Sequence, residues 1–188
     1  LWFVDIDTDD ALGINPQEPL VRSSERALSR AGDGWDVEMH GQIEHQFLYH
    51  CITGSEMTHF TTRDYPTAVL PLQISGNNYN LLDKNTARSN GLRHLANWIS
   101  EASELWENNK EESNDDTVIE YLDHWGKLQN QDPNPRYRVL QNSGGSYVTG
   151  AVVDTHDLED IKVNGTTIDL ARNNDGYIPL VVDHKCYY

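Results

Sequence analysis

The sequence predicts an α+β domain in which two or three helices pack on a mostly antiparallel sheet. Two observations support this prediction. Apolar residues recur at helical spacing from Asn90 to Trp106 and again after Asp116, whereas the last third of the chain reads as strands flanking short turns. Helices and strands that gather in separate parts of a chain are typical of the α+β class.

The length of 188 residues fits a single domain with a sizeable hydrophobic core. Composition divides it loosely into a mixed part (1–85), a helical part (86–131) and a β-rich part (132–188). Apolar runs reach both ends of the sequence, whereas natural domains usually taper into polar termini. We therefore expect the domain to be a fragment of a longer polypeptide.

The first 31 residues are expected to hold a strand and a helix. Residues 1–7 begin with an apolar run that predicts a strand. Residues 17–31 predict a helix, because prolines stand near its start and glycines follow its end. Arg22, Arg26 and Arg30 recur every four residues, so such a helix would present them on one face. That face either pairs with nearby glutamates or contacts phosphates.

The next region mixes helix and strand signals. Residues 37–53 carry apolar side chains at helical spacing, at positions 43, 47, 48, 51 and 52. Residues 67–74 predict a strand, and Pro71 within it indicates a sheet edge or a bulge, because proline donates no backbone hydrogen bond. Residues 76–79 predict the turn that follows.

Two helices are predicted in the middle of the chain. The first spans Asn90 to Trp106, where an apolar stripe is formed by Leu92, Leu95, Ala96, Ile99, Ala102 and Trp106. The second is expected to be capped by Asp115 or Asp116 and to end near Gln131, before a proline. The acidic stretch around the connection between them predicts a solvated outer face.

Two hairpins are predicted in the β-rich part. Residues 137–140 and 147–153 read as strands joined by the glycine-rich residues 142–146. Asn164–Gly165 is the strongest two-residue hairpin signal, because both residues tolerate positive φ angles. A last strand is expected within residues 176–188.

The chain is strongly acidic, with 30 Asp and Glu against 14 Lys and Arg and a net charge of −16. Concentrated salt screens repulsion among such charges, so this balance indicates a halophilic source and argues only weakly against a nucleic-acid partner. The two distant cysteines indicate free thiols in a reducing cytoplasm. No apolar run reaches the length of a membrane helix, so we expect a cytoplasmic protein without membrane contact.

Catalytic and cofactor-binding motifs are not recognisable in this chain. Residues 144–148 lack the second glycine of a nucleophile elbow, and no phosphate-binding glycine loop follows a strand. The N-terminal acidic residues faintly match aspartate motifs of two hydrolase families; they are Asp5, Asp7, Asp9 and Asp10. A solvated strand end in an acidic protein explains them as well, so we expect no catalytic residue, metal site or cofactor here.

Short segments between residues 43 and 188 together resemble one protein family. They are Ile43–Tyr49, Gly54–Phe60, Ala68–Leu72, Gly91–Ile99, Leu105–Glu107, Lys127–Gln131, Arg136–Gly144, Ala151–Asp154 and Asp183–Tyr188. In order and spacing these segments resemble the C-terminal part of adenine-specific DNA methyltransferases of restriction-modification systems. The first 40 residues match no family pattern.

The resemblance implies a reader of double-stranded DNA that is not catalytic by itself. In that family the methyl-donor domain, which binds S-adenosylmethionine, precedes this region, and the region itself holds target recognition. Recognition needs phosphate contacts for register and side chains that reach base edges, typically Arg for guanine and Asn or Gln for adenine. The DNA-binding candidates are Arg136, Arg138, Gln141, Asn142, Ser143 and Ser146, together with Arg22, Arg26 and Arg30.

The residues around the predicted hairpin also allow functions other than DNA recognition. Arg136 and Arg138 alternate with Tyr137 and Val139, as side chains do in any half-exposed strand. A protein-interaction module of a larger assembly is therefore the first alternative to DNA recognition. A fragment of a metal-dependent hydrolase that uses the N-terminal aspartates is the second.

Overall fold

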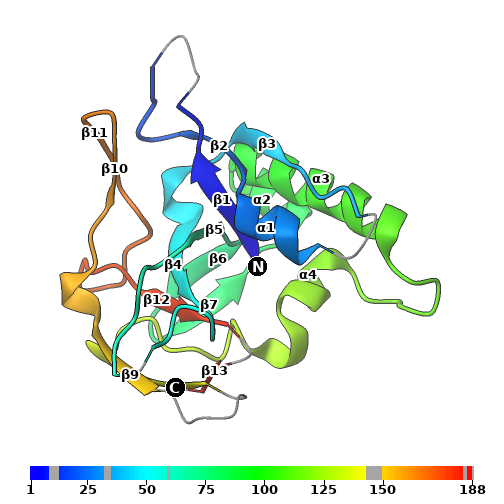
Figure 1. The fold of residues 1–188 in the computed structure, drawn as a ribbon. Coiled ribbons are helices and arrows are strands. Elements are labelled where there is room, and N and C mark those ends of the chain that lie inside the picture. Colours follow the sequence, from blue (N-terminus) through cyan, green and yellow to red (C-terminus); the bar gives the residue numbers. More distant parts are fainter. Residues whose placement is uncertain (9–12, 32–34, 59, 143–149, 184–185, 188) are drawn as a thin grey trace.

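The computed structural model describes residues 1–8, 13–31, 35–58, 60–142, 150–183 and 186–187. Its centre is a six-stranded sheet in the order β12-β4-β5-β1-β2-β3 (Figure 1). The strands are β1 (Trp2–Ile6), β2 (Leu20–Ser23), β3 (His40–Gln42), β4 (Leu48–Ile52), β5 (Thr67–Val69) and β12 (Leu180–Val182). Only β12 and β4 pair in parallel; the other four pairings are antiparallel. The predicted α+β class and mostly antiparallel sheet are confirmed.

Smaller hairpins surround the main sheet. They are β6 (Leu72–Ser75) with β7 (Asn78–Leu81), β8 (Tyr137–Asn142) with β9 (Gly150–Asp154), and β10 (Ile161–Val163) with β11 (Thr166–Ile168). A short strand, β13 (Cys186–Tyr187), adds to the free edge of β8. Asn164 and Gly165 both have positive φ angles, 49° and 81°, which confirms the predicted two-residue turn.

The helices are α1 (Glu25–Arg30), α2 (Lys84–Ser89), α3 (Arg93–Asn109) and α4 (Val118–Leu122). Three single 3-10 turns accompany them, namely η1 (His45–Phe47), η2 (His124–Gly126) and η3 (Thr155–Asp157). The predicted apolar stripe is buried in α3 except at Leu92, which is the partly buried N-cap, and the helix packs against α2, α4 and β3. Among the described residues, no helix combines the length and apolar composition needed to cross a membrane.

The helix predicted over residues 17–31 is wrong in its first half. That half forms β2, in which Val21 is buried and Arg22 is exposed. Helix α1 begins only after Ser24, whose hydroxyl accepts a hydrogen bond from the Ala27 amide. Arg22 therefore lies on a strand, and the three arginines do not form one helical stripe.

The helix suggested by residues 37–53 is also wrong. These residues form β3, η1 and β4. Most of the apolar side chains lie in β4, which runs between β5 and β12 and is buried on both faces. A strand buried on both faces carries an almost continuous apolar run, and such a run is difficult to distinguish from a helix by periodicity.

Several further boundaries differ from the sequence prediction. The second central helix ends at Leu122, and its N-cap is Thr117, which forms a capping box with Glu120. After it the Asp123 carboxylate accepts hydrogen bonds from the Leu128 and Gln129 amides, which holds an irregular turn instead of a helix. Pro71 separates β5 from β6, and the strand expected within 176–188 is divided into β12 and β13.

Two polar side chains join parts of the chain that are far apart in the sequence. The Glu44 carboxylate accepts hydrogen bonds from the His94 and Leu95 amides at the start of α3, at 3.0 and 2.9 Å. The Gln131 side chain bonds both the amide and the carbonyl of Val182 in β12, at 2.9 and 2.8 Å. These contacts join residues 50 or more positions apart in the sequence.

Candidate functional site

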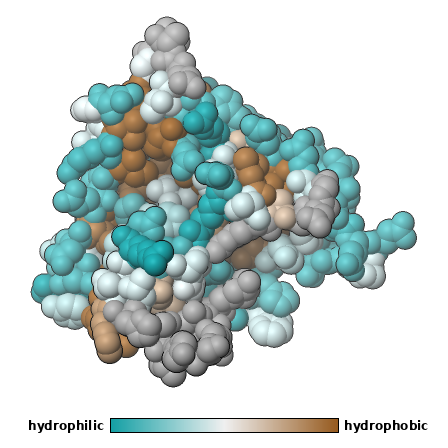
Figure 2. Space-filling view, in the orientation of Figure 1, coloured by the Kyte–Doolittle hydropathy of each residue, from teal (hydrophilic) through white to brown (hydrophobic). Residues whose placement is uncertain are grey.

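The β8–β9 hairpin presents one face to solvent and one to the core. Tyr137, Val139 and Val152 lie on the solvent face and are 56%, 67% and 62% exposed, and Gln141 is exposed beside them. The opposite face is buried and consists of Arg138, Leu140, Ala151 and Val153. Figure 2 shows hydrophobic residues at the surface at the lower left, where β9 lies; larger hydrophobic areas lie at the upper left and right of centre of the same view.

Arg136 stands at the base of this solvent face. Its Nε and Nη2 donate to the Asp154 carboxylate at 3.1 and 3.0 Å, and its guanidinium lies 5.0 Å from the centre of the Tyr137 ring. The hydrogen bond from Arg136 lowers the pKa of Asp154, so this carboxylate stays ionised near neutral pH. Arg136 is about half exposed, but its charge is already balanced by Asp154.

Arg138 does not lie on the solvent face that the sequence prediction assigns to it. It is 4% exposed, and its guanidinium donates to the Asp132 carbonyl oxygen. Asn142 ends β8, and its backbone pairs with Cys186 of β13. Ser143 and Ser146, also predicted to contact DNA, lie outside the described residues.

The other three predicted arginines belong to a different part of the molecule, around β1, β2 and α1 (Figure 1). Arg22 is exposed on β2, and Arg30 ends α1. Arg26 forms an ion pair with the buried Glu56 and donates to the hydroxyl groups of Thr53 and Ser55, both at 2.8 Å. Arg26 is thus part of an internal network, and the predicted residues that the structure describes do not form one surface.

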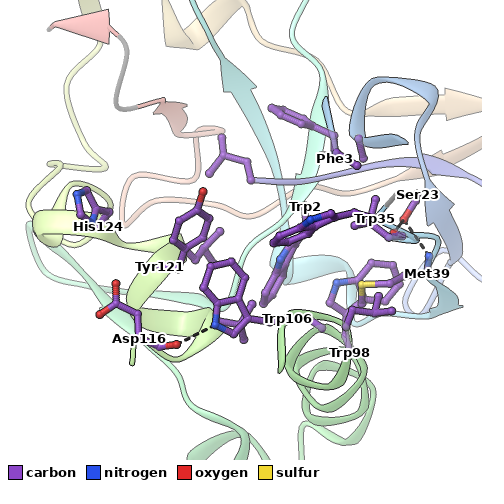
Figure 3. Close-up of a pocket in the computed structure, with 18 of the residues that line it drawn as sticks. Trp2, Phe3, Ser23, Trp35, Met39, Trp98, Trp106, Asp116, Tyr121 and His124 are labelled. Carbon is purple, nitrogen blue, oxygen red and sulfur yellow. Dashed lines mark hydrogen bonds between the residues drawn. The ribbon is translucent and has the colours of Figure 1, made fainter. Parts of the chain in front are cut away.

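A large aromatic pocket is a feature that the sequence prediction missed. It has a volume of about 970 Å³ and lies between β1, α1, α3 and α4. Trp2 lies in the middle of the lining, with Trp35 on one side and Tyr121 on the other (Figure 3). Trp106 stacks on Tyr121 with 4.3 Å between ring centres and meets the edge of Trp35 at 6.0 Å. Its indole nitrogen donates to the Asp116 carbonyl at 2.8 Å.

The pocket offers mainly van der Waals and stacking contacts, with charged groups such as Asp116 and Lys127 at its lining. The spacing of Trp98 and Trp106 on α3 is a local signal, because residues eight apart lie near the same side of a helix. Trp2 and Trp35 join them only through the fold of the sheet and the following loop, which no local pattern reveals.

Asp5 and Asp7 are the N-terminal aspartates that the structure describes. The Asp7 carboxylate lies 2.8 Å from Nε2 of His40, and Asp9 and Asp10 lie outside the described residues. Within the described ranges, no group of three or more His, Cys, Asp or Glu side chains is arranged to hold a metal ion. Comparison of the chain with protein-family models, with curated proteins and with solved structures found no match.

Proposed function

We propose that this domain recognises double-stranded DNA through the solvent face of the β8–β9 hairpin. It would act as the target-recognition region of an adenine-N6 DNA methyltransferase of a restriction-modification system. The observation that carries this proposal is the exposed antiparallel ribbon formed by two of the segments that resemble that family. The major groove of DNA is wide enough to admit a two-stranded β-ribbon.

The side chains on this face suit contacts to DNA bases and phosphates. The amide of Gln141 can donate to and accept from an adenine edge at the same time, and the methyl groups of Val139 and Val152 can contact a thymine methyl. Arg136 has guanidinium protons beyond the two that bond Asp154, and these suit a phosphate oxygen. Arg138 and Arg26 are assigned structural roles, because both are held by internal partners.

Methyl transfer itself is assigned to another part of a longer polypeptide. S-adenosylmethionine would bind the methyl-donor domain there, and the present chain would supply only the reading surface. The coding sequence upstream should then contain a glycine-rich methyl-donor loop and an (Asn/Asp)-Pro-Pro-(Tyr/Phe) motif. Their absence from a complete upstream reading frame would contradict the methyltransferase assignment and leave DNA binding to be judged separately.

The role of Arg136 can be tested by substitution. Arg136→Ala should weaken binding to a duplex of about 30 base pairs, roughly three helical turns, and should reduce the salt dependence of binding by about one phosphate contact. Lys162→Ala is a matched control, because Lys162 is also an exposed base in an ion pair but lies on the β10–β11 hairpin. Fluorescence anisotropy at several KCl concentrations measures both effects; equal losses for the two variants would contradict the assignment.

A protein partner is the second candidate for the same face. Tyr137, Val139 and Val152 form three neighbouring exposed apolar positions, as interaction surfaces often do. If replacing Val139 and Val152 by Ser leaves the affinity for DNA unchanged, this alternative is favoured. A loss of DNA affinity in that double variant, with the fold retained, would favour DNA recognition.

A further inference from the structure

We infer that Phe60 is a second DNA-contacting element beside the β8–β9 hairpin, one that inserts its ring between neighbouring bases. This inference rests on the proposed DNA recognition. It assigns to Phe60 the task of opening or filling a base stack, which is distinct from reading base edges on the hairpin face.

Phe60 combines an exposed ring with an unfavourable backbone. It is 90% exposed, more than any other large hydrophobic side chain of the described residues. Its φ angle is 67°, in the left-handed region that bulky residues rarely adopt. Glycine or asparagine would satisfy the backbone there at lower cost. Trp125 shares both features, so they indicate a contact outside this chain only together with the attachment of Phe60 to the β8–β9 hairpin.

The hairpin and Phe60 are joined directly. The Phe60 amide donates to the Gly150 carbonyl at 3.0 Å, and Phe60 forms a parallel bridge with Ala151 of β9. In the β8–β9 register Gly150 pairs with Gln141, so Phe60 lies at the end of the hairpin that carries Gln141. A duplex docked on the hairpin face at this end would be within reach of the Phe60 loop.

The loop around Phe60 is held by its own contacts. The Thr58 amide and hydroxyl both donate to the Thr61 carbonyl, at 2.9 and 3.1 Å. Met57 and Thr62 form a bridge, and the Arg63 amide donates to the carbonyl of the buried Glu56 at 3.0 Å. These bonds hold the described residues on either side of Phe60 to one another and to the buried Glu56.

The segment after Phe60 carries an exposed basic side chain that suits a phosphate. Arg63 is exposed three residues after Phe60, and no ion-pair partner for its guanidinium occurs among the described residues. A segment that carries both an exposed aromatic ring and an exposed guanidinium matches a duplex, which offers stacked bases flanked by phosphates. Enzymes that modify a base must take it out of its stack, so a stacking side chain is chemically useful at such a site.

The experiment compares three variants of the protein, Phe60→Ala, Phe60→Trp and Trp125→Ala. Trp125 is the matched control: it is 80% exposed and also has a positive φ angle, 62°, but lies after α4 beside acidic residues such as Glu120. Because Phe60 is exposed, Phe60→Ala should leave the circular dichroism spectrum unchanged. The probe is a duplex enriched from a random pool by repeated binding and elution, with 2-aminopurine placed at each adenine in turn.

Stacking of one base on an aromatic side chain is worth enough to change affinity by about 10-fold. Phe60→Ala should therefore weaken binding by about that factor, Phe60→Trp should retain it, and Trp125→Ala should change it less than about twofold. The wild-type protein should raise the fluorescence of 2-aminopurine at one position, and Phe60→Ala should abolish the rise. Unchanged affinity and fluorescence in Phe60→Ala would overturn this inference alone. Failure of the wild-type protein to enrich any duplex would overturn both proposals.

Discussion

Glu56 is a buried carboxylate whose ionisation depends on its hydrogen bonds. Burial raises its pKa, but bonds from Thr53, Ser55 and Arg26 lower it by more, so the pKa in the folded protein lies below its ordinary value. A depressed folded pKa contributes stability that is fully present above the unfolded pKa of about 4.3 and is lost as pH falls through the folded value.

Replacing this carboxylate gives a prediction for pH dependence. Glu56→Gln should lower the free energy of unfolding by about 2 kcal/mol at neutral pH, because Arg26 would lose its charged partner. The variant should also lose less stability than the wild-type protein as the pH falls below about 4. Urea denaturation followed by circular dichroism measures both quantities. Glu159→Gln is the control, since Glu159 is an exposed ion-paired carboxylate. If the free energy of unfolding depends on pH in the same way in both variants, Glu56 does not have the role assigned to it.

Residues of the β8–β9 hairpin show what a sequence can and cannot predict about a site. Alternation correctly indicates that Arg138 and Val139 face opposite sides, but it does not say which side is buried. Hydropathy alone would bury Val139 and expose Arg138, whereas the structure does the reverse. The Asp132 carbonyl satisfies the Arg138 guanidinium inside, and that contact depends on the turn before β8.

Elements differ in how far their local sequence determines them. Helix α3 and the β10–β11 hairpin follow from local patterns, because their apolar stripe and their Asn-Gly turn act over a few residues. Strand β4 does not, because its burial on both faces arises from β5 and from β12, which is about 130 residues away. The aromatic pocket likewise gathers Trp2, Trp35 and Trp106 from three distant segments.

Helix α3 depends on a distant residue for its start. Its N-cap, Leu92, has no side chain able to accept a hydrogen bond, and the Glu44 carboxylate bonds the first amides instead. Glu44→Ala should lower the free energy of unfolding by about 1–2 kcal/mol, since capping bonds and a negative charge at a helix start are both lost. Glu44→Gln should cost less. Thermal denaturation measures the stability of both variants. If Glu44→Ala does not change the stability, the Glu44 cap contributes nothing.

The whole molecule carries far more negative than positive charge, with a net charge of −16. Mutual repulsion among these charges should destabilise the fold in dilute buffer and weaken as salt screens it. Between about 0.1 M and about 1 M KCl the Debye length falls from about 10 Å to about 3 Å. We therefore predict that the folded circular dichroism signal drops sharply below molar salt. Full stability in dilute buffer would contradict the halophilic interpretation.

An acidic domain can bind DNA only if its binding face is less negatively charged than the rest of its surface. The β8–β9 face carries Gln141, the Arg136–Asp154 ion pair and apolar side chains, while an acidic stretch lies along α3 and the connection to α4. This arrangement would direct the hairpin towards DNA and the acidic side away from it, because phosphates repel carboxylates.

The proposed function requires that this domain distinguish one DNA sequence from others. The most direct measurement is selection of duplexes from a random pool by the wild-type protein in molar KCl and at lower salt, followed by sequencing. We predict enrichment of one short motif that contains adenine, and loss of preference at one position of that motif in Gln141→Ala. A pool that stays random at every salt concentration at which the protein is folded would contradict the claim.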